Sequence, residues 1–174
     1  MKKLIALALA AALSLSVLTG CGGSKKPAAQ ASKTPEELVE LYTKAITDNG
    51  GEDVEYNPVI TEFKAEDGSD YMAEAMGIKA EDLKAFGISA SMMNISAYAI
   101  AAVMPAEGKD ADVKAVLDAY VAQKQGEFEH YLPDQYEITK NAKVETLDDG
   151  TILMVMCENS DKVFEGISNA ILGK

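Results

Sequence analysis

Apolar side chains recur every three or four positions along three stretches of the chain, a spacing typical of amphipathic helices. The first stretch opens with Thr34, Pro35 and Glu37, which form a capping box with proline at the first helical position. It closes at residues 49–51, Asn-Gly-Gly, since glycine readily adopts the left-handed backbone found where helices end. The body of the chain is therefore expected to begin with a helix at Thr34.

Two further long helices are expected in the second half of the body. The first starts at Asp110, which is placed to cap it, and follows an apolar stripe that ends at Phe128. The second starts at one of residues 159–161 and turns one apolar face inward. That face consists of Val163, Phe164, Ile167 and Ile171.

Shorter elements fill the region between the first helix and the sheet. Residues 69–76 predict a short helix capped by Ser69 or Asp70, and residues 80–86 predict one more helical turn. Residues 59–63, after a polar loop, have the composition of a short strand.

Four segments have the patterns of strands in a sheet: 88–93, 97–104, 142–147 and 151–157. The last two are joined by residues 148–150, Asp-Asp-Gly, which predict a hairpin turn. The strand after this turn is apolar on both faces and should therefore be central and covered. With the helices, the order is α-(α)-β-β-α-β-β-α, which predicts an α+β domain with helices packed on an antiparallel sheet of about four strands.

The N-terminus of the chain has the pattern of a signal peptide. Two lysines precede residues 4–17, an apolar run that is too short for a membrane-spanning helix of about 20 residues. The following residues, Leu18-Thr19-Gly20-Cys21, resemble the bacterial lipobox. The resemblance implies cleavage between Gly20 and Cys21 and transfer of a diacylglycerol to the Cys21 thiol. The simpler alternative is an ordinary secretory signal in which this cysteine is incidental.

The signal-peptide pattern and the lipobox resemblance together predict three parts of the chain. Residues 1–20 form the lipoprotein signal peptide, residues 21–33 hold the lipidated cysteine and a flexible tether, and residues 34–174 form a single domain. The tether carries three lysines, which either attract it to an anionic leaflet or simply keep it solvated. The expected location is extracytoplasmic, on the outer face of the cell membrane.

The charge of the domain limits the classes of partner that it can bind. All 28 acidic residues follow Lys33, against 11 lysines, so this part of the chain carries a formal charge of −17 and contains no arginine. Such a surface is poorly suited to nucleic acid, which proteins bind through lysine and arginine. It suits cations or basic partners, although it is also what a solvated surface requires.

Few residues offer catalytic chemistry. Lipidation of Cys21 leaves Cys157 without a partner for a disulfide, and the apolar run before Cys157 predicts a small buried side chain. The one histidine, His130, lies in a polar loop with Tyr131 and Tyr136, and these three are the candidate ligand-binding residues. No nucleophile motif, phosphate loop or zinc-ligand spacing occurs, so no catalytic residue, metal or cofactor is expected.

Three other chemistries have partial support. Abundant carboxylates would suit an envelope hydrolase or an enzyme accessory. The acidic turns at 66–70 and 148–150 would suit a cation-binding module, although such turns are commonly just solvated. Methionine thioethers would suit Cu(I), although methionine at helix or strand spacing usually fills a core. The methionines concerned are Met72, Met76, Met92, Met93, Met154 and Met156.

Two long stretches resemble a known family. They are SMMNISAYAIAAVMPAEGKDADVKAVLDAY and FEHYLPDQYEITKNAKVETLDDGTILMVMCENSDKVFEGI, and the similarity extends over residues 80–167. The chain resembles small lipoproteins of Gram-positive bacteria that share a domain of unknown function. The resemblance implies an anchored extracytoplasmic domain and assigns it no activity. The combined expectation is a lipid-anchored, non-catalytic module that contacts the membrane through its anchor and binds an unidentified protein or small molecule.

Overall fold

The structure is a computed structural model, and it describes residues 33–174 of the chain. Its elements are α1 (Pro35–Asn49), α2 (Asp53–Tyr56), α3 (Ser69–Met76), the 3-10 helix η1 (Ala80–Asp82), β1 (Leu83–Ala90), β2 (Ala99–Pro105), α4 (Asp110–Phe128), α5 (Pro133–Lys140), β3 (Lys143–Thr146), β4 (Ile152–Met156) and α6 (Ser160–Leu172). This is the expected α+β fold, with the expected order of long helices and strands.

The four strands form one antiparallel sheet in the order β1-β2-β4-β3. Strand β4 lies inside the sheet and all five of its residues are buried, which confirms the expectation of a central, doubly covered strand. The hairpin before it is also confirmed, because the Leu147 amide donates to the Thr151 carbonyl at 2.7 Å and Gly150 takes φ 90°.

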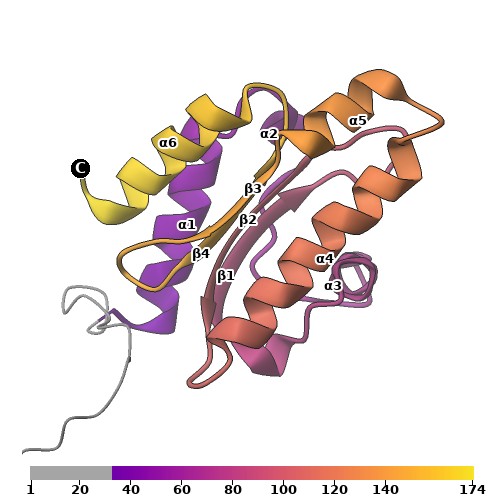
Figure 1. Cartoon of the computed structure of the whole chain (residues 1–174). Helices are drawn as coiled ribbons and strands as arrows, with labels where there is room; N and C mark the ends of the chain where they lie inside the picture. The colour runs from indigo at the N-terminus through magenta and orange to yellow at the C-terminus, as the bar shows by residue number, and fades with distance from the viewer. Residues whose placement is uncertain (1–32) are drawn as a thin grey trace, which may run out of the picture.

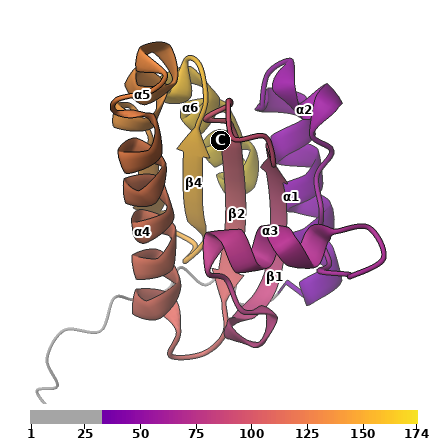
Figure 2. The ribbon, with the colours of Figure 1, turned by 90° about the vertical axis from the view of Figure 1, so that its right-hand side faces the viewer.

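Helices cover both faces of the sheet, so the molecule has three layers (Figures 1 and 2). Helices α1 and α6 pack side by side on one face, over a buried cluster that includes Leu38, Tyr42 and Ile167. Helices α3 and α4 cover the other face, over a second cluster that includes Leu117 and Met154. The segment 33–174 thus contains a complete sheet and a core on each side of it, which is what a domain needs to fold independently.

Local sequence explains the first helix. The Glu37 amide donates to the Thr34 hydroxyl at 3.2 Å, and the Thr34 amide donates to the Glu37 carboxylate at 2.7 Å, so the expected capping box is present. The four residues that α1 buries are Leu38, Tyr42, Ala45 and Ile46. The cap fixes where the helix begins, and the spacing of these apolar residues determines which face of the helix meets the sheet.

The first strand begins earlier than the sequence pattern predicts. Residues 80–86 were expected to be helical, but only Ala80–Asp82 form a 3-10 turn, and β1 starts at Leu83. Pairing with β2 and burial of Phe86, whose ring stacks on Phe63 at 4.4 Å, outweigh the local helical preference. The expected strand at 59–63 is likewise reduced to a single bridge between Ile60 and Ile88.

The same strand also ends earlier than expected. Residues 88–93 were predicted as a strand, but β1 stops at Ala90 and the chain turns through an exposed connection to β2. The predicted cap of α4 is wrong by one residue, since Lys109 is the N-cap and Asp110 is the first helical residue. Lys109 is fixed there by ion pairs with Asp82 at 2.8 Å and Asp112 at 3.8 Å.

Two short helices replace predicted loops. The stretch HYLPDQY was expected to be a loop, yet Pro133 opens α5 at its first position. This helix is stabilised by α4, because the Gln125 side chain donates to the Thr139 carbonyl at 3.0 Å. The polar segment after α1 also contains a helix, α2, which no apolar periodicity signals because only Val54 is buried.

Candidate functional site

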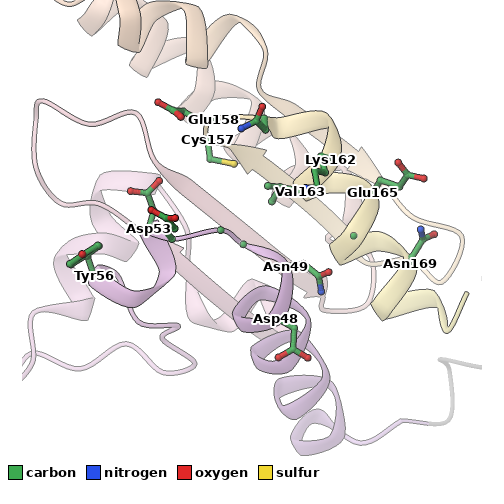
Figure 3. A pocket seen from close by; sticks show the side chains of 15 residues that line it. Asp48, Asn49, Asp53, Tyr56, Cys157, Glu158, Lys162, Val163, Glu165 and Asn169 are labelled. Carbon is green, nitrogen blue, oxygen red and sulfur yellow. The ribbon is translucent and has the colours of Figure 1, made fainter.

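A cleft of about 940 Å³ opens at the end of the sheet where β4 finishes (Figure 3). The turn after α1 and helix α2 form one side of it, and the first turns of α6 form the other. Its lining residues are Asp48, Asn49, Gly50, Gly51, Glu52, Asp53, Tyr56, Cys157, Glu158, Asn159, Lys162, Val163, Glu165, Gly166 and Asn169. We refer to this feature as the cleft.

Glycine shapes the α1–α2 side of the cleft. A Cβ atom on Gly50 would lie 2.4 Å from Val54 Cγ2 and 2.7 Å from the Ile46 carbonyl oxygen, so only glycine lets the chain turn this tightly. The next residue, Gly51, takes φ 83°, a left-handed conformation that glycine adopts without strain. These two residues therefore fold α2 back against the end of α1.

The α6 side depends on an unusual backbone and a close helix contact. Asn159 has φ 56° and is the only non-glycine residue with positive φ in the described part of the chain. Asparagine tolerates this conformation better than most residues, and here it turns the chain from β4 directly into α6. Further along α6, a Cβ atom on Gly166 would lie 2.8 Å from Asn49 Oδ1, so α1 and α6 are in near contact at the cleft wall.

Cys157 lies between the two sides, with its sulfur visible at the centre of Figure 3. The thiol is free and buried, which confirms the expected small buried cysteine. Its pKa is raised to about 12, chiefly by burial and in smaller part by the negative charges of Asp53 and Glu158. The thiol is therefore protonated at neutral pH and is a poor nucleophile.

Acidic side chains dominate the cleft. Its carboxylates are Asp48, Glu52, Asp53, Glu158 and Glu165, against the single ammonium of Lys162. Asp48 pairs with Lys44 on α1. Glu52, Asp53 and Glu158 are exposed in the cleft, and none of the three makes an ion pair within residues 33–174. The arrangement suits a cationic group better than an anionic one.

A second, shallower cleft of about 540 Å³ adjoins the first around residues 157–162. Helix α5 supplies its other side through Glu137 and Ile138. The two sides are tied together because the Ser160 hydroxyl donates to the Asn141 carbonyl at 2.7 Å. Both clefts therefore open at the same end of the sheet.

The connection between β1 and β2, residues 91–98, lies at that end too, and Figure 2 shows it between α5 and α2. We call it the apolar loop, because Met92, Met93 and Ile95 are 56%, 61% and 54% exposed. Its base is buried and held by the Ser91 amide, which donates to the Tyr98 carbonyl at 2.9 Å.

Hydrogen bonds fix the apolar loop to α5 and the end of β1, which leads into the loop, to the residue after α2. On one side, the Ala97 amide donates to the Gln135 side chain of α5 at 2.7 Å. On the other side the bond comes from the end of β1, just before the loop, where the Ser89 hydroxyl donates to the carbonyl of Asn57, the residue that follows α2. The loop thus lies between α5 and the cleft wall formed by α2.

The three candidate residues from the sequence do not come together as a site. His130 is almost fully exposed and lies 3.7 Å from the Glu129 carboxylate, and Tyr131 is exposed beside it at the α4–α5 corner. Tyr136 lies on α5, half-buried, with the Lys140 ammonium 5.1 Å from its ring centroid. None of the three lines either of the two clefts at the end of β4.

The structure places the methionines and acidic turns that were considered for metal binding in different environments. Met72, Met76, Met154 and Met156 are core residues, as expected, but Met92 and Met93 are exposed rather than buried. The acidic turn at 148–150 is not simply solvated, since Asp149 is buried and accepts hydrogen bonds from Thr151. No group of three or more His, Cys, Asp or Glu residues within residues 33–174 is arranged to hold a metal ion.

The lipidation site lies outside the described residues. The predicted signal peptide, which ends at Gly20, and the predicted lipidated residue Cys21 both precede residue 33. Within 33–174, no helix combines the length and apolar character needed to cross a membrane.

Sequence patterns missed the cleft because it joins two polar connections, residues 50–52 and 157–159, and the helices beside them, which are distant in the sequence. The run Asn49-Gly50-Gly51 was recognised only as the end of a helix, and Asn159 only as a possible beginning of one. The sequence signal for the cleft was the presence of glycine and asparagine at positions whose backbone other residues adopt only with strain.

The fold and these clefts define a class of protein: a small three-layer α+β domain with an acidic cleft and an exposed apolar loop at one end of its sheet. Residues 60–157 match the family described as domain of unknown function (DUF4358), and the chain belongs to that family. No curated protein and no solved structure matches the chain. The family match includes all four strands, whereas α1, α2 and α6, which form the walls of the cleft, lie outside it.

Proposed function

We propose that the protein is a lipid-anchored module on the outer face of a bacterial cell membrane, which binds a ligand or partner protein without catalysing a reaction. The lipobox-like residues Leu18-Thr19-Gly20-Cys21 support the anchor. Two or more acyl chains on one protein give durable attachment, whereas a single chain is marginal.

One observation carries the non-catalytic part of the proposal. The only thiol at the cleft, Cys157, has its pKa raised to about 12, chiefly by burial, and the negative charges of Asp53 and Glu158 disfavour its thiolate further instead of a histidine activating it. Nucleophilic catalysis needs a nucleophile activated by a neighbouring base or by a lowered pKa. The one histidine of the chain, His130, is exposed at the α4–α5 corner and does not line the cleft.

The anchor is tested by metabolic labelling of expressing cells with an alkyne fatty acid. We expect the wild-type protein to take up label and fractionate with membranes, and Cys21→Ala to lose both properties. The matched control is Cys157→Ala, which removes the other cysteine and should label like the wild type. Label retained on Cys21→Ala would contradict the proposed anchor.

Binding is tested by thermal melting of the segment 33–174 against metals, sugars, peptides and cell-wall fragments. A ligand that binds only the native state raises the melting midpoint, because at one hundred times its Kd it adds about 2.7 kcal/mol to the free energy of unfolding. Mass spectrometry of the recovered ligand then separates binding from catalysis. A ligand returned chemically altered would contradict the non-catalytic proposal.

A further inference from the structure

We infer that the end of the sheet bearing the apolar loop binds a basic, amphipathic segment of a partner protein. This inference deepens the proposed binding function and rests on it. The apolar loop would contact the apolar side chains of that segment, and the acids of the cleft would pair with its lysines or arginines.

The first support is the clustering of exposed apolar side chains. Single exposed apolar residues are normal on protein surfaces, but adjacent ones mark interaction sites. Met92, Met93 and Ile95 are each more than half exposed within four consecutive residues, whereas the core of the domain is otherwise well covered. Tyr56, 82% exposed, lies on α2 at the near edge of the cleft.

The loop is positioned before any partner arrives. Its own turns are hydrogen-bonded, since the Met93 amide donates to the Ser91 hydroxyl at 3.2 Å and the Ser96 amide donates to the Met93 carbonyl at 3.3 Å. Below it, the hydroxyls of Tyr98 and Ser89 are 2.8 Å apart in the core. A surface ordered in advance loses less conformational entropy on binding.

Methionine side chains suit a partner of variable shape. They are unbranched and polarisable, so they adapt to different apolar surfaces, and proteins that bind several amphipathic helices use them for this reason. Two of the three exposed side chains of the loop are methionines.

Charge selects a basic partner. Around the loop, Glu52, Asp53 and Glu55 belong to the α2 region and Glu158 follows β4, and none of the four makes an ion pair within the described chain. On the opposite side, α5 contributes Asp134. An anionic leaflet would be repelled by these carboxylates, and a second copy of this chain would bring the same negative charge. A segment with lysine or arginine beside apolar residues satisfies both parts of the surface.

The test uses the segment 33–174 and a fluorescein-labelled leucine–lysine peptide of about five helical turns. Binding is followed by fluorescence anisotropy at low and high salt. Control peptides replace either all lysines by glutamine or all leucines by serine. We expect the parent peptide to bind, both control peptides to bind more weakly, and added salt to weaken binding.

Two protein variants locate the site. The loop variant carries Met92→Ser, Met93→Ser and Ile95→Ser, and it is matched by Tyr71→Ser, an exposed apolar side chain on α3. We expect the loop variant to weaken binding about tenfold or more, and Tyr71→Ser to change it by less than about twofold. Because all four side chains are exposed, the melting midpoint should stay near that of the wild type.

The charge variant carries Glu52→Gln, Asp53→Asn and Glu158→Gln. Its matched control removes three exposed acids elsewhere: Glu40→Gln, Glu81→Gln and Glu107→Gln. Both variants lose the same net charge, so a general attraction between an acidic protein and a basic peptide would weaken equally in both. We expect about tenfold weaker binding and a smaller salt dependence only for the charge variant.

Methyl spectra of the methionines give a direct readout. With methyl-labelled methionine, the peptide should shift the resonances of Met92 and Met93 and leave those of the buried Met154 and Met156 unchanged. Equal weakening in the charge variant and its control, or shifts confined to other methionines, would overturn the inference.

The remaining outcomes separate the other occupants and the proposed function. Binding of the segment to phosphatidylcholine vesicles that is lost in the loop variant, without peptide binding, would overturn the inference in favour of a membrane contact. A dimer in light scattering that the loop variant abolishes, without peptide binding, would overturn it in favour of self-association. Thermal stabilisation by a sugar or metal with no peptide binding would overturn the inference and leave the proposed binding function intact.

Discussion

The buried hydroxyl chain at the β3–β4 hairpin allows a sharp energetic test. Tyr42 and Thr151 are fully buried, their hydroxyl oxygens are 2.7 Å apart, and Thr151 donates to Asp149 Oδ2 at 2.8 Å. Because the Thr151 proton goes to Asp149, the Tyr42 hydroxyl must donate to Thr151. Tyr42→Phe therefore removes one neutral hydrogen bond while Thr151 still donates to Asp149, and it should cost about 1 kcal/mol of the free energy of unfolding.

Thr151→Val should lower the free energy of unfolding by more, although valine has nearly the same shape as threonine. It leaves two buried groups without this partner, the Tyr42 hydroxyl and one oxygen of Asp149, and each such group costs about 1–3 kcal/mol. We therefore expect a loss of about 2–6 kcal/mol, or roughly 4–24 °C in Tm for a domain of this size. When residue 151 is already valine, the Tyr42 hydroxyl has lost its partner. Removing that hydroxyl by Tyr42→Phe should then cost nothing, or restore about 1 kcal/mol of the free energy of unfolding.

Urea unfolding of the segment 33–174, followed by far-ultraviolet circular dichroism, measures all four states of this cycle. Tyr131→Phe is the control, since its exposed hydroxyl should be worth less than about 0.5 kcal/mol. If Tyr42→Phe costs the same with threonine or valine at position 151, the hydroxyls are not coupled and the reasoning fails.

Two further predictions concern the cleft. Gly50→Ala should destabilise the domain by about 1–3 kcal/mol in urea unfolding, because its Cβ would meet the Ile46 carbonyl at 2.7 Å. Gly126→Ala, on α4 with nothing within 4 Å of the added Cβ, should instead stabilise it by about 0.5–1 kcal/mol, and the same sign for both would contradict this. Cys157 should react with a thiol reagent at pH 8 only as fast as the domain opens. Folding raises its pKa from 9.0 to about 12, so the native state keeps a proton that the unfolded chain releases. The stability of the wild type relative to Cys157→Ala should therefore fall as the pH rises above about 9, and a constant difference up to pH 11 would refute this.

The sequence determined the elements whose signals are local. The capping box at Thr34 fixed the start of α1, because both of its hydrogen bonds form within one helical turn. The turn at 148–150 and the apolar run after it determined a hairpin and a central strand, since only a strand covered on both faces can be apolar on both. The lipobox resemblance at Cys21 is also local, and it remains the basis of the proposed anchor.

Only the tertiary structure decided the elements that depend on distant partners. Leu83–Phe86 became a strand because β2 pairs with it, and α5 formed where Thr139 could be buried against α4. The acidic turn at 148–150 has the composition of a solvated turn. Its residue Asp149 is nevertheless buried, because Thr151 supplies its hydrogen bonds inside the core.

The cleft and the apolar loop belong to this second group as well. The polar connections at 49–53 and 157–159 are more than one hundred residues apart in sequence, and they meet because α1 and α6 pack side by side on the same face of the sheet. The pattern of residues 88–93 predicts a strand, but β1 ends at Ala90 and leaves Met92 and Met93 exposed beyond the sheet. Periodicity along a chain reports which residues share a face, whereas the length of a sheet and the coverage of its ends depend on which other elements reach them.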